Sequence, residues 1–432
     1  MPAHYPEDWS PRGLLHSAAM GPLSTRGVWC GAGYLGRSRA DVRESVSRLA
    51  DLGFNLLLPN LKDGAGRVCW RSEALPSATH EAYHDFDLPL ILLEECERVG
   101  MRLHAWFIDF YEGERGAAFR SHPEWAMRDA HGNATAEETL RGKRFGSVWM
   151  CPAQRPGYAD QWLIPLYEEF ARRYAFEALH HDYVRYPGDL APDQYCFCNW
   201  CLDEIPRWAT YESERFPDER FEHELYDRPY LEAHWEPSPR VLPEGWRKWA
   251  RSERARFLLE GGFFAGGRRD LDYFFYTFRV EAIQRFVREC TEAVRAVAPS
   301  MKLSGAFFKN PIHSGRFIGQ DWRRFPPHVN VCVPMDYRDH FPGDFEQYIA
   351  LLKETIGRQR EWAAGFEQLW VGFAINFLFK EEPTGPYPAE KVNEVIGAIR
   401  ESQPDGVVVF CAEQIEEFGV ADALRSALRE AG

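Results

Sequence analysis

Polar residues follow many of the short apolar runs in this chain, and carboxylates are frequent among them. Asp109, Asp182 and Asp336 lie at the ends of three such runs, and Glu413 follows the last one. A partly buried carboxylate is costly unless it is paired, so proteins usually keep one for chemistry or in an ion pair. Two such groups facing one another could act as proton donor and as nucleophile or base in a hydrolysis.

Asparagines occupy the equivalent place after three other runs: Asn60, Asn310 and Asn376. Residues 179–187 read Leu-His-His-Asp-Tyr-Val-Arg-Tyr-Pro and surround Asp182 with further polar groups. Because side chains alternate along a strand, His180 and Asp182 should point into the site and His181 away from it. Arg185 is expected to pair with a carboxylate or to bind substrate. The alternative is that these side chains form a buried cluster that only supports the fold.

The elements that must position these groups are short apolar runs alternating with amphipathic stretches, which predicts repeated βα units. Strands are expected at 26–31, 54–60, 102–109, 177–183, 301–308, 329–335, 369–375 and 406–411. Helices are expected at 38–52, 88–99, 157–174, 271–297, 345–361, 388–401 and 420–429. Eight strands with intervening helices indicate the α/β class and a (β/α)8 TIM barrel, whose site lies at the carboxyl ends of the strands.

The domain organisation follows from this pattern. Residues 1–24 are expected to be an N-terminal extension and residues 25–432 a single barrel domain. Residues 188–268, rich in proline, aromatic residues and alternating charge, are predicted to be a loop insertion near the active site. Trp200, Tyr226, Tyr230 and Trp235 in this insertion are available to stack on a ligand. A doubly wound dinucleotide fold is the alternative, since Gly31, Gly33 and Gly36 have a suitable spacing, but no ribose-binding acid ends the second strand.

Composition restricts the partners. The formal net charge is −14 and no dense lysine or arginine run is present, which argues against nucleic acid or an anionic membrane as partner. No leader peptide or membrane span is evident, so a cytoplasmic location is expected. The aromatic share of 15% is high and suits sugar rings, which pack on aromatic faces. Homo-oligomerisation is left open.

Three of the ten cysteines, Cys196, Cys198 and Cys201, lie close together in the insertion. They resemble half of a structural zinc site, for which Cys151, Cys69 or a histidine would have to supply a fourth ligand. Free buried thiols and a disulfide are the other interpretations.

The 179–187 run resembles the fourth-strand motif of the glycosyl hydrolase-like family 10 proteins, a group distinct from the xylanase family ten. Other segments resemble the family in order and spacing: 26–29, 52–55, 103–107, 122–125 and 334–337. The similarity extends over residues 25–413. It implies a glycosidase on a TIM barrel, with the family's aspartate at Asp182 and its histidine at His180. Tyr183 stands where the family can have a second acid.

Glycoside hydrolysis uses two carboxyl groups, so this resemblance assigns roles. Asp182 is the expected nucleophile, and the acid/base is expected to be Asp336, then Glu413, then Asp109. Asp336 is favoured because the sixth strand faces the fourth across the barrel. The groups expected to hold an oligo- or polysaccharide are His180, Arg185, Asp109, Trp106, Asn60, Tyr337 and Asn376. No cofactor is expected.

Two further functions remain open at this point. A carbohydrate-binding barrel without turnover is favoured by Tyr183 in place of the second acid. A metal-dependent barrel hydrolase would use His104, His180, His181 and Asp182, although the first strand lacks the histidine pair typical of such barrels.

Overall fold

The structure is a computed structural model that describes residues 23–135, 139–140, 143–144, 147–190, 194–214, 242–260 and 268–431. Eight parallel strands close into a barrel in the order β1-β12-β11-β10-β9-β8-β3-β2. Their bounds are β1 (Thr25–Gly31), β2 (Leu56–Lys62), β3 (Arg102–Ile108), β8 (Ala178–Asp182), β9 (Lys302–Phe308), β10 (Val331–Met335), β11 (Gln368–Ala374) and β12 (Gly406–Phe410). The predicted TIM barrel is confirmed.

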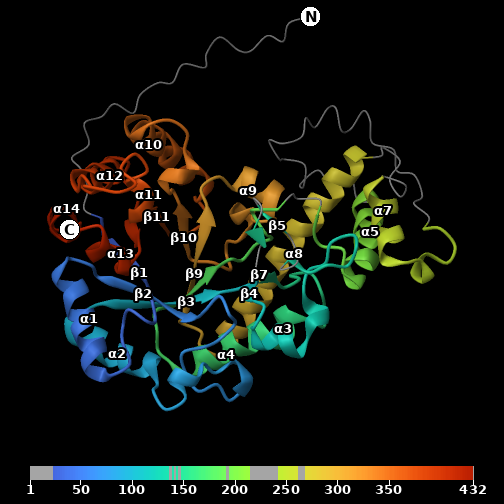
Figure 1. Cartoon of the computed structure of the whole chain (residues 1–432), viewed down its shortest axis with the longest axis horizontal. Helices are drawn as coiled ribbons and strands as arrows, with labels where there is room; N and C mark the ends of the chain where they lie inside the picture. Colours follow the sequence, from blue (N-terminus) through green and yellow to red (C-terminus); the bar gives the residue numbers. More distant parts are fainter. Residues whose placement is uncertain are drawn as a thin grey trace, which may run out of the picture.

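Helices surround the strands and connect them in sequence (Figure 1). The connecting helices are α1 (Arg39–Asp51), α2 (Leu88–Val99), α4 (Ile164–Arg173), α8 (Arg268–Val297), α9 (Pro311–Ile318), α10 (Phe345–Trp362), α12 (Glu390–Glu401) and α14 (Ala421–Ala431). Shorter or additional helices are α3 (Ala117–Ser121), α5 (Asn199–Glu214), α7 (Arg251–Leu259), α11 (Ile375–Leu378) and α13 (Ala412–Glu417). A π-helical turn at Ala159–Leu163 precedes α4.

Local sequence signals explain where the helices begin and end. Ser38 caps α1 in a capping box with Asp41, which satisfies amide groups that have no partner within the helix. Asp87 caps α2, and Gly100 ends this helix in the left-handed conformation, with φ of 71°, that favours glycine.

The barrel interior is filled by side chains that alternate along the strands. The buried interior cluster consists of Trp29, Leu56, Leu58, Trp106, Ala306, Val331, Val333, Trp370 and Val408. The side chains between them face the helices and join the larger core. The register of β3 against β8 pairs Trp106 with His180 and Ile108 with Asp182. Because side chains alternate along a strand, this register decides which strand-end side chains point into the barrel and which point toward the helices. The carboxyl end of the barrel is called the mouth below.

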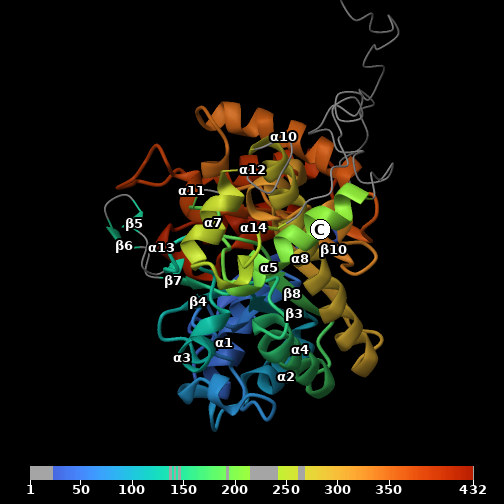
Figure 2. The same cartoon turned by 90° about the vertical axis from the view of Figure 1, so that its right-hand side faces the viewer.

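Two long excursions leave the barrel on either side of β8. The first, between β3 and β8, carries two small antiparallel sheets: β4 (Tyr111–Gly113) with β7 (Ser147–Trp149), and β5 (Thr139–Leu140) with β6 (Lys143–Arg144). The second carries α5 and α7, which pack on one another and on α8 at one side of the barrel (Figures 1 and 2). Buried residues of α5 and α7 belong to the same core cluster as the barrel's outer face. The single-domain description stays a prediction.

The predicted element bounds differ from the structure by a few residues. The clearest difference is β2, which continues beyond Asn60 to Lys62 through an irregularity in its pairing with β3. Lys62 is fully buried, and its ammonium donates to the carbonyl of Ile108. Within the described part of the chain, no helix is long and apolar enough to cross a membrane.

Candidate active site at the barrel mouth

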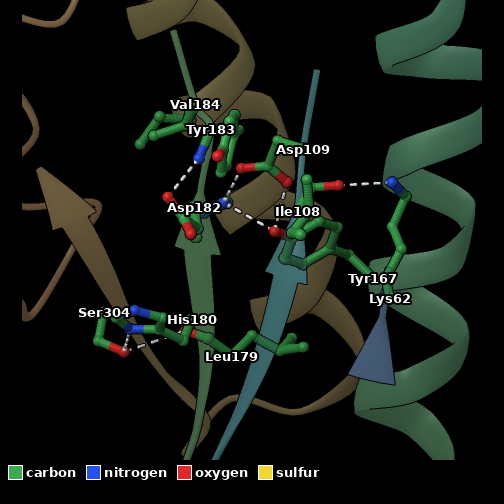
Figure 3. Close-up of polar contacts among 12 residues, drawn as sticks. Lys62, Ile108, Asp109, Tyr167, Leu179, His180, Asp182, Tyr183, Val184 and Ser304 are labelled. Atoms are coloured by element: carbon green, nitrogen blue, oxygen red, sulfur yellow. Dashed lines mark hydrogen bonds and ion pairs between the residues drawn. The ribbon is translucent and has the colours of Figure 1, made fainter. Parts of the chain in front are cut away.

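Asp182 is the last residue of β8, and its side chain points to the barrel interior at the mouth (Figure 3). The amide N–H of Tyr183 donates to Oδ1 at 2.7 Å, and the indole N–H of Trp106 donates to Oδ2 at 3.1 Å. The residue is 7% exposed. Burial raises the pKa of this carboxyl to about 6, against the opposing charge of Arg185 and the two hydrogen bonds. Asp182 is therefore a fixed carboxyl that changes charge near neutral pH.

His180 lies one layer below Asp182 and is fully buried inside the barrel. Trp29 donates its indole N–H to His180 Nε2 at 3.1 Å, so the ring proton is on Nδ1, which lies 2.8 Å from Ser304 Oγ. Burial holds the pKa of His180 well below its usual value, so the ring is neutral. The expectation that His180 binds substrate is corrected, because the ring packs inside the barrel and is hydrogen-bonded to Trp29 and Ser304.

Asp109 follows β3 and faces the helix layer, because it comes one residue after the inward-facing Ile108 (Figure 3). The hydroxyl of Tyr167 on α4 donates to Oδ1 at 2.6 Å, and Nδ1 of His181 lies 3.0 Å from Oδ2. Both acid and histidine are fully buried. The outward direction predicted for His181 is confirmed, whereas the substrate-binding and acid roles expected for Asp109 are corrected.

Asp336 is turned away from the mouth for the same reason, since it follows the inward-facing Met335 of β10. Its Oδ1 accepts from Gln359 of α10 at 2.9 Å. Oδ2 is buried without a hydrogen-bond partner among the described residues. Burial raises the pKa of Asp336 to about 8, so the carboxyl is mostly protonated at pH 7. Asp336 is buried behind the barrel wall, and its expected role as catalytic acid is corrected.

Glu413 is an exposed carboxylate in the first turn of α13, directly after β12. Its Oε1 accepts the amide N–H of Gly31 at 2.6 Å, which holds it at the carboxyl end of β1. β12 and β1 lie on the opposite side of the closed barrel from β8. Of the four carboxyls proposed from the sequence, Glu413 therefore lies at the mouth together with Asp182.

Aromatic rings surround the space beside Asp182. The guanidinium of Arg185 lies 5.0 Å from the ring centre of Trp149, 4.6 Å from that of Tyr183 and 5.0 Å from that of Phe308. The guanidinium Nε is buried without a hydrogen-bond partner in the described part of the chain. Arg185 thus sits in an aromatic cage next to the carboxyl, as a partly exposed cation.

A second aromatic group lies toward β10 and β12. The partly exposed ring of Tyr337 is 5.9 Å from Phe410 and 6.1 Å from Phe377. Phe410 is also 6.3 Å from Trp106, in an edge-on arrangement. Tyr337 remains a candidate to stack on a ring-shaped ligand. Trp106 instead serves Asp182 through its indole N–H, with 9% of its surface exposed.

The three asparagines differ in role. Asn60 faces the mouth, and its amide nitrogen donates to the carbonyls of Lys62 and Trp106. Asn376 lies at the start of α11 with a buried Oδ1 that has no hydrogen-bond partner among the described residues. Asn310 caps α9 by accepting two backbone N–H groups and is explained by that structural role. Asn60 and Asn376 therefore remain substrate-binding candidates.

The metal-dependent alternative does not fit the geometry. His104 and His180 meet at Ser304 Oγ deep in the barrel, while His181 faces the helices. Together with Asp182 these groups do not converge on one point. The dinucleotide alternative is excluded by the closed barrel.

Residues 24–198 match the model of the Glycosyl hydrolase-like 10 family. The predicted resemblance is thereby confirmed over this part of the chain. It includes the fourth-strand motif at 179–187 and the segments 26–29, 52–55 and 103–107, whereas 334–337 lies outside the matched region. No curated protein matches the sequence.

Solved structures with a similar fold include glycosidases. The glycoside hydrolase domain of PgaB (BpsB) from Bordetella bronchiseptica has a TM-score of 0.63 at 13% identity, over 94% of this chain and 98% of that one. The catalytic domain of the β-amylase from Paenibacillus polymyxa has a TM-score of 0.60 at 11% identity, over 96% and 100%. The β-galactosidase from Rahnella sp. R3 has a TM-score of 0.60 at 15% identity, over 97% of this chain and 57% of that one. These likenesses establish the barrel.

The site contains residues that the sequence analysis did not assign to it. Tyr183 was noted only as the replacement of an acid, yet its amide and ring flank Asp182 and Arg185. Trp149, on β7, and Phe410, at the end of β12, were also missed. The position of Phe410 at a strand end was an available signal. Trp149 lies on a small sheet outside the barrel, and no local pattern indicated that this sheet approaches the mouth.

Proposed function

We propose that this protein is a glycoside hydrolase whose central catalytic group is Asp182. The observation that carries the proposal is this carboxyl itself: it ends the fourth barrel strand, faces the mouth and is fixed by two hydrogen bonds. Barrel enzymes place their catalytic residues at such strand ends. The family match over residues 24–198 and the glycosidases that share the fold support the same reaction class.

The raised pKa changes the role expected for Asp182. A nucleophile must be ionised throughout the working range, whereas an acid/base must gain and lose a proton within it. A pKa of about 6, caused first by burial, suits the second role. We therefore assign Asp182 as the general acid/base: its protonated form gives the proton to the glycosidic oxygen as the bond breaks, and the carboxylate that remains can then take a proton from water.

A second carboxyl is required at the mouth, and Glu413 is the proposed partner. It is exposed, whereas Asp109 and Asp336 are buried behind the barrel wall. Its hydrogen bond to the Gly31 amide fixes one carboxylate oxygen and leaves the other available to act as a nucleophile or as a water-activating base. The rings of Tyr337 and Tyr183 provide faces for a sugar, so an oligo- or polysaccharide is the proposed substrate class.

A carbohydrate-binding barrel without turnover is the second candidate. It is favoured by one observation: two of the carboxyls expected at the mouth, Asp109 and Asp336, are turned toward the helices. Binding would then use the aromatic rings and Arg185, with Asp182 as a hydrogen-bonding group.

One experiment separates the two functions. The full chain is assayed with a panel of aryl glycosides and oligosaccharides, and binding of the same oligosaccharides is measured by calorimetry. Asp182→Asn is expected to lower kcat by at least about 10²-fold while binding persists, because an amide cannot transfer the proton. Circular dichroism checks the fold, since the amide can accept only one of the two N–H groups that Asp182 accepts. Binding without turnover in the unaltered chain would support the second candidate and contradict the first.

A further inference from the structure

Four cysteines from two separate excursions meet beside the barrel. Cys151 follows β7, and Cys196, Cys198 and Cys201 lie on the segment that enters α5. Their Sγ atoms all lie within 4.8 Å of one another, and all four residues are buried. They are called the cysteine cluster below. Nothing in the proposed hydrolysis uses them.

The spacing of the sulfur atoms distinguishes the interpretations of these thiols. Cys151 Sγ lies 3.5 Å from Cys201 Sγ and 3.8 Å from Cys198 Sγ. A disulfide requires about 2.05 Å, so neither pair is bonded. Four sulfurs around one tetrahedral ion with Zn–S bonds of about 2.3 Å are roughly 3.8 Å apart. The two short distances match this spacing, and all four sulfurs lie within 4.8 Å of one another.

Backbone N–H groups point at two of the four sulfurs. The amide N–H of Cys198 donates to Cys196 Sγ at 3.4 Å, and the amide N–H of Cys201 donates to Cys198 Sγ at 3.5 Å. Hydrogen bonds to ligating sulfurs orient them and stabilise their charge. Thiols that only fill space in the core would not require two excursions to converge on one point. They would not require N–H groups directed at their sulfurs either.

We propose that the cysteine cluster binds a single Zn²⁺ ion through four thiolates. With four protein ligands the site is closed, so the ion has a structural role and takes no part in the hydrolysis. The fourth ligand left open by the sequence is Cys151. Cys69, the other cysteine considered, instead contacts the carbonyl of Asn60. Each thiol gives up its proton to solvent when the ion binds.

The ion would join the two excursions that flank β8. Trp149, two residues before Cys151, contacts Tyr183 and Arg185 of the aromatic cage. Cys201 lies in α5, which packs on α8. A metal at the cysteine cluster therefore fixes one wall of the mouth relative to the helices outside the barrel.

Metal content of the purified full chain tests the proposal. Inductively coupled plasma mass spectrometry is expected to find about one zinc per chain, and less than about a tenth of that in Cys198→Ser and in Cys151→Ser. Cys96→Ser is the matched control, since Cys96 is also fully buried but lies in α2, outside the cluster. It should keep the metal.

A second measurement does not depend on the variants folding. The unaltered chain is stripped with a chelator and titrated with Co²⁺, which should give the intense sulfur-to-metal absorption of tetrahedral thiolate coordination with one ion per chain. Four thiols should become reactive toward a disulfide reagent on stripping and become protected again on adding Zn²⁺. A metal-free protein that binds neither ion, or zinc retained by both cluster variants, would overturn the site. Iron in place of zinc in the purified chain would overturn the assignment of the ion.

Discussion

Trp106 donates its indole N–H to Oδ2 of Asp182 across two neighbouring barrel strands, at 3.1 Å. The register that pairs Trp106 with His180 places the indole level with the strand end where Asp182 lies. Burial alone would raise the pKa of Asp182 further, and this hydrogen bond, the Tyr183 amide and the Arg185 charge oppose it. Trp106 therefore lowers the pKa of the Asp182 carboxyl as well as orienting it.

Trp106→Phe should raise the pKa of Asp182 above about 6, because it removes a hydrogen bond that favours the charged form. The pH profile of kcat/KM should move to higher pH at the limb that reports Asp182. Loss of one hydrogen bond to a charged group corresponds to about 1.5–3 kcal/mol, or roughly one to two pH units. Assays between pH 4 and 9 measure the movement.

Trp29→Phe is the matched control for this substitution. Trp29 also lies in the barrel interior, but its indole N–H donates to His180 rather than to Asp182. It should lower stability without moving the pH profile. Equal movement of the profile in both variants would mean that barrel packing, and not the hydrogen bond, sets the pKa.

Asp336→Asn should leave kcat within about twofold of the unaltered chain, because the carboxyl is buried against Gln359 and mostly protonated at pH 7. The amide resembles this protonated form. A loss of more than about tenfold on substrates with poor leaving groups would restore Asp336 as the catalytic acid.

The same variant should change how stability depends on pH. The pKa of Asp336 is 3.8 for a free carboxyl and about 8 in the folded chain. A raised pKa contributes stability that is complete below the unfolded value and is lost as pH rises through the folded one. The unaltered chain should therefore lose about 2–4 kcal/mol from this group between pH 5 and 8, and Asp336→Asn should not. Denaturant unfolding across this range compares the two slopes.

The barrel was predictable because eight apolar runs with helical stretches between them have few other solutions. The direction of the strand-end acids was harder to predict. In β3 and β10 both faces are buried, one in the barrel and one under helices. The residues before Asp109 and Asp336 are therefore apolar on both faces, and their pattern does not show which face points into the barrel. Only the pairing between strands shows that these two acids fall one position past the inward-facing residue. In β8 the motif at residues 179–187 was sufficient to predict that Asp182 points into the barrel.

Arg185→Gln and Arg185→Lys should separate the charge of Arg185 from its stacking. Glutamine removes the positive charge that lowers the pKa of Asp182, so the pH profile should move upward. Lysine keeps the charge but loses the planar contact with Trp149, Tyr183 and Phe308, so KM should rise with little movement of the profile. Identical pH profiles for glutamine and lysine would show that the charge of Arg185 does not act on Asp182.

Glu413→Gln tests the second carboxyl. The amide oxygen can still accept the Gly31 N–H, so the fold should persist, while kcat should fall by about 10²–10⁴-fold because an amide can neither attack nor activate water. Gly31→Ala should act in the same direction with Glu413 intact, since the added Cβ would lie 2.7 Å from Glu413 Oε1 and displace it.

Asp189→Asn is the control, because Asp189 is another exposed acid near Arg185. If Asp189→Asn abolishes turnover and Glu413→Gln does not, the second carboxyl lies on the β8 side of the mouth. Two acids from one side would hold a substrate against the aromatic cage, whereas Asp182 and Glu413 would hold it across the barrel axis.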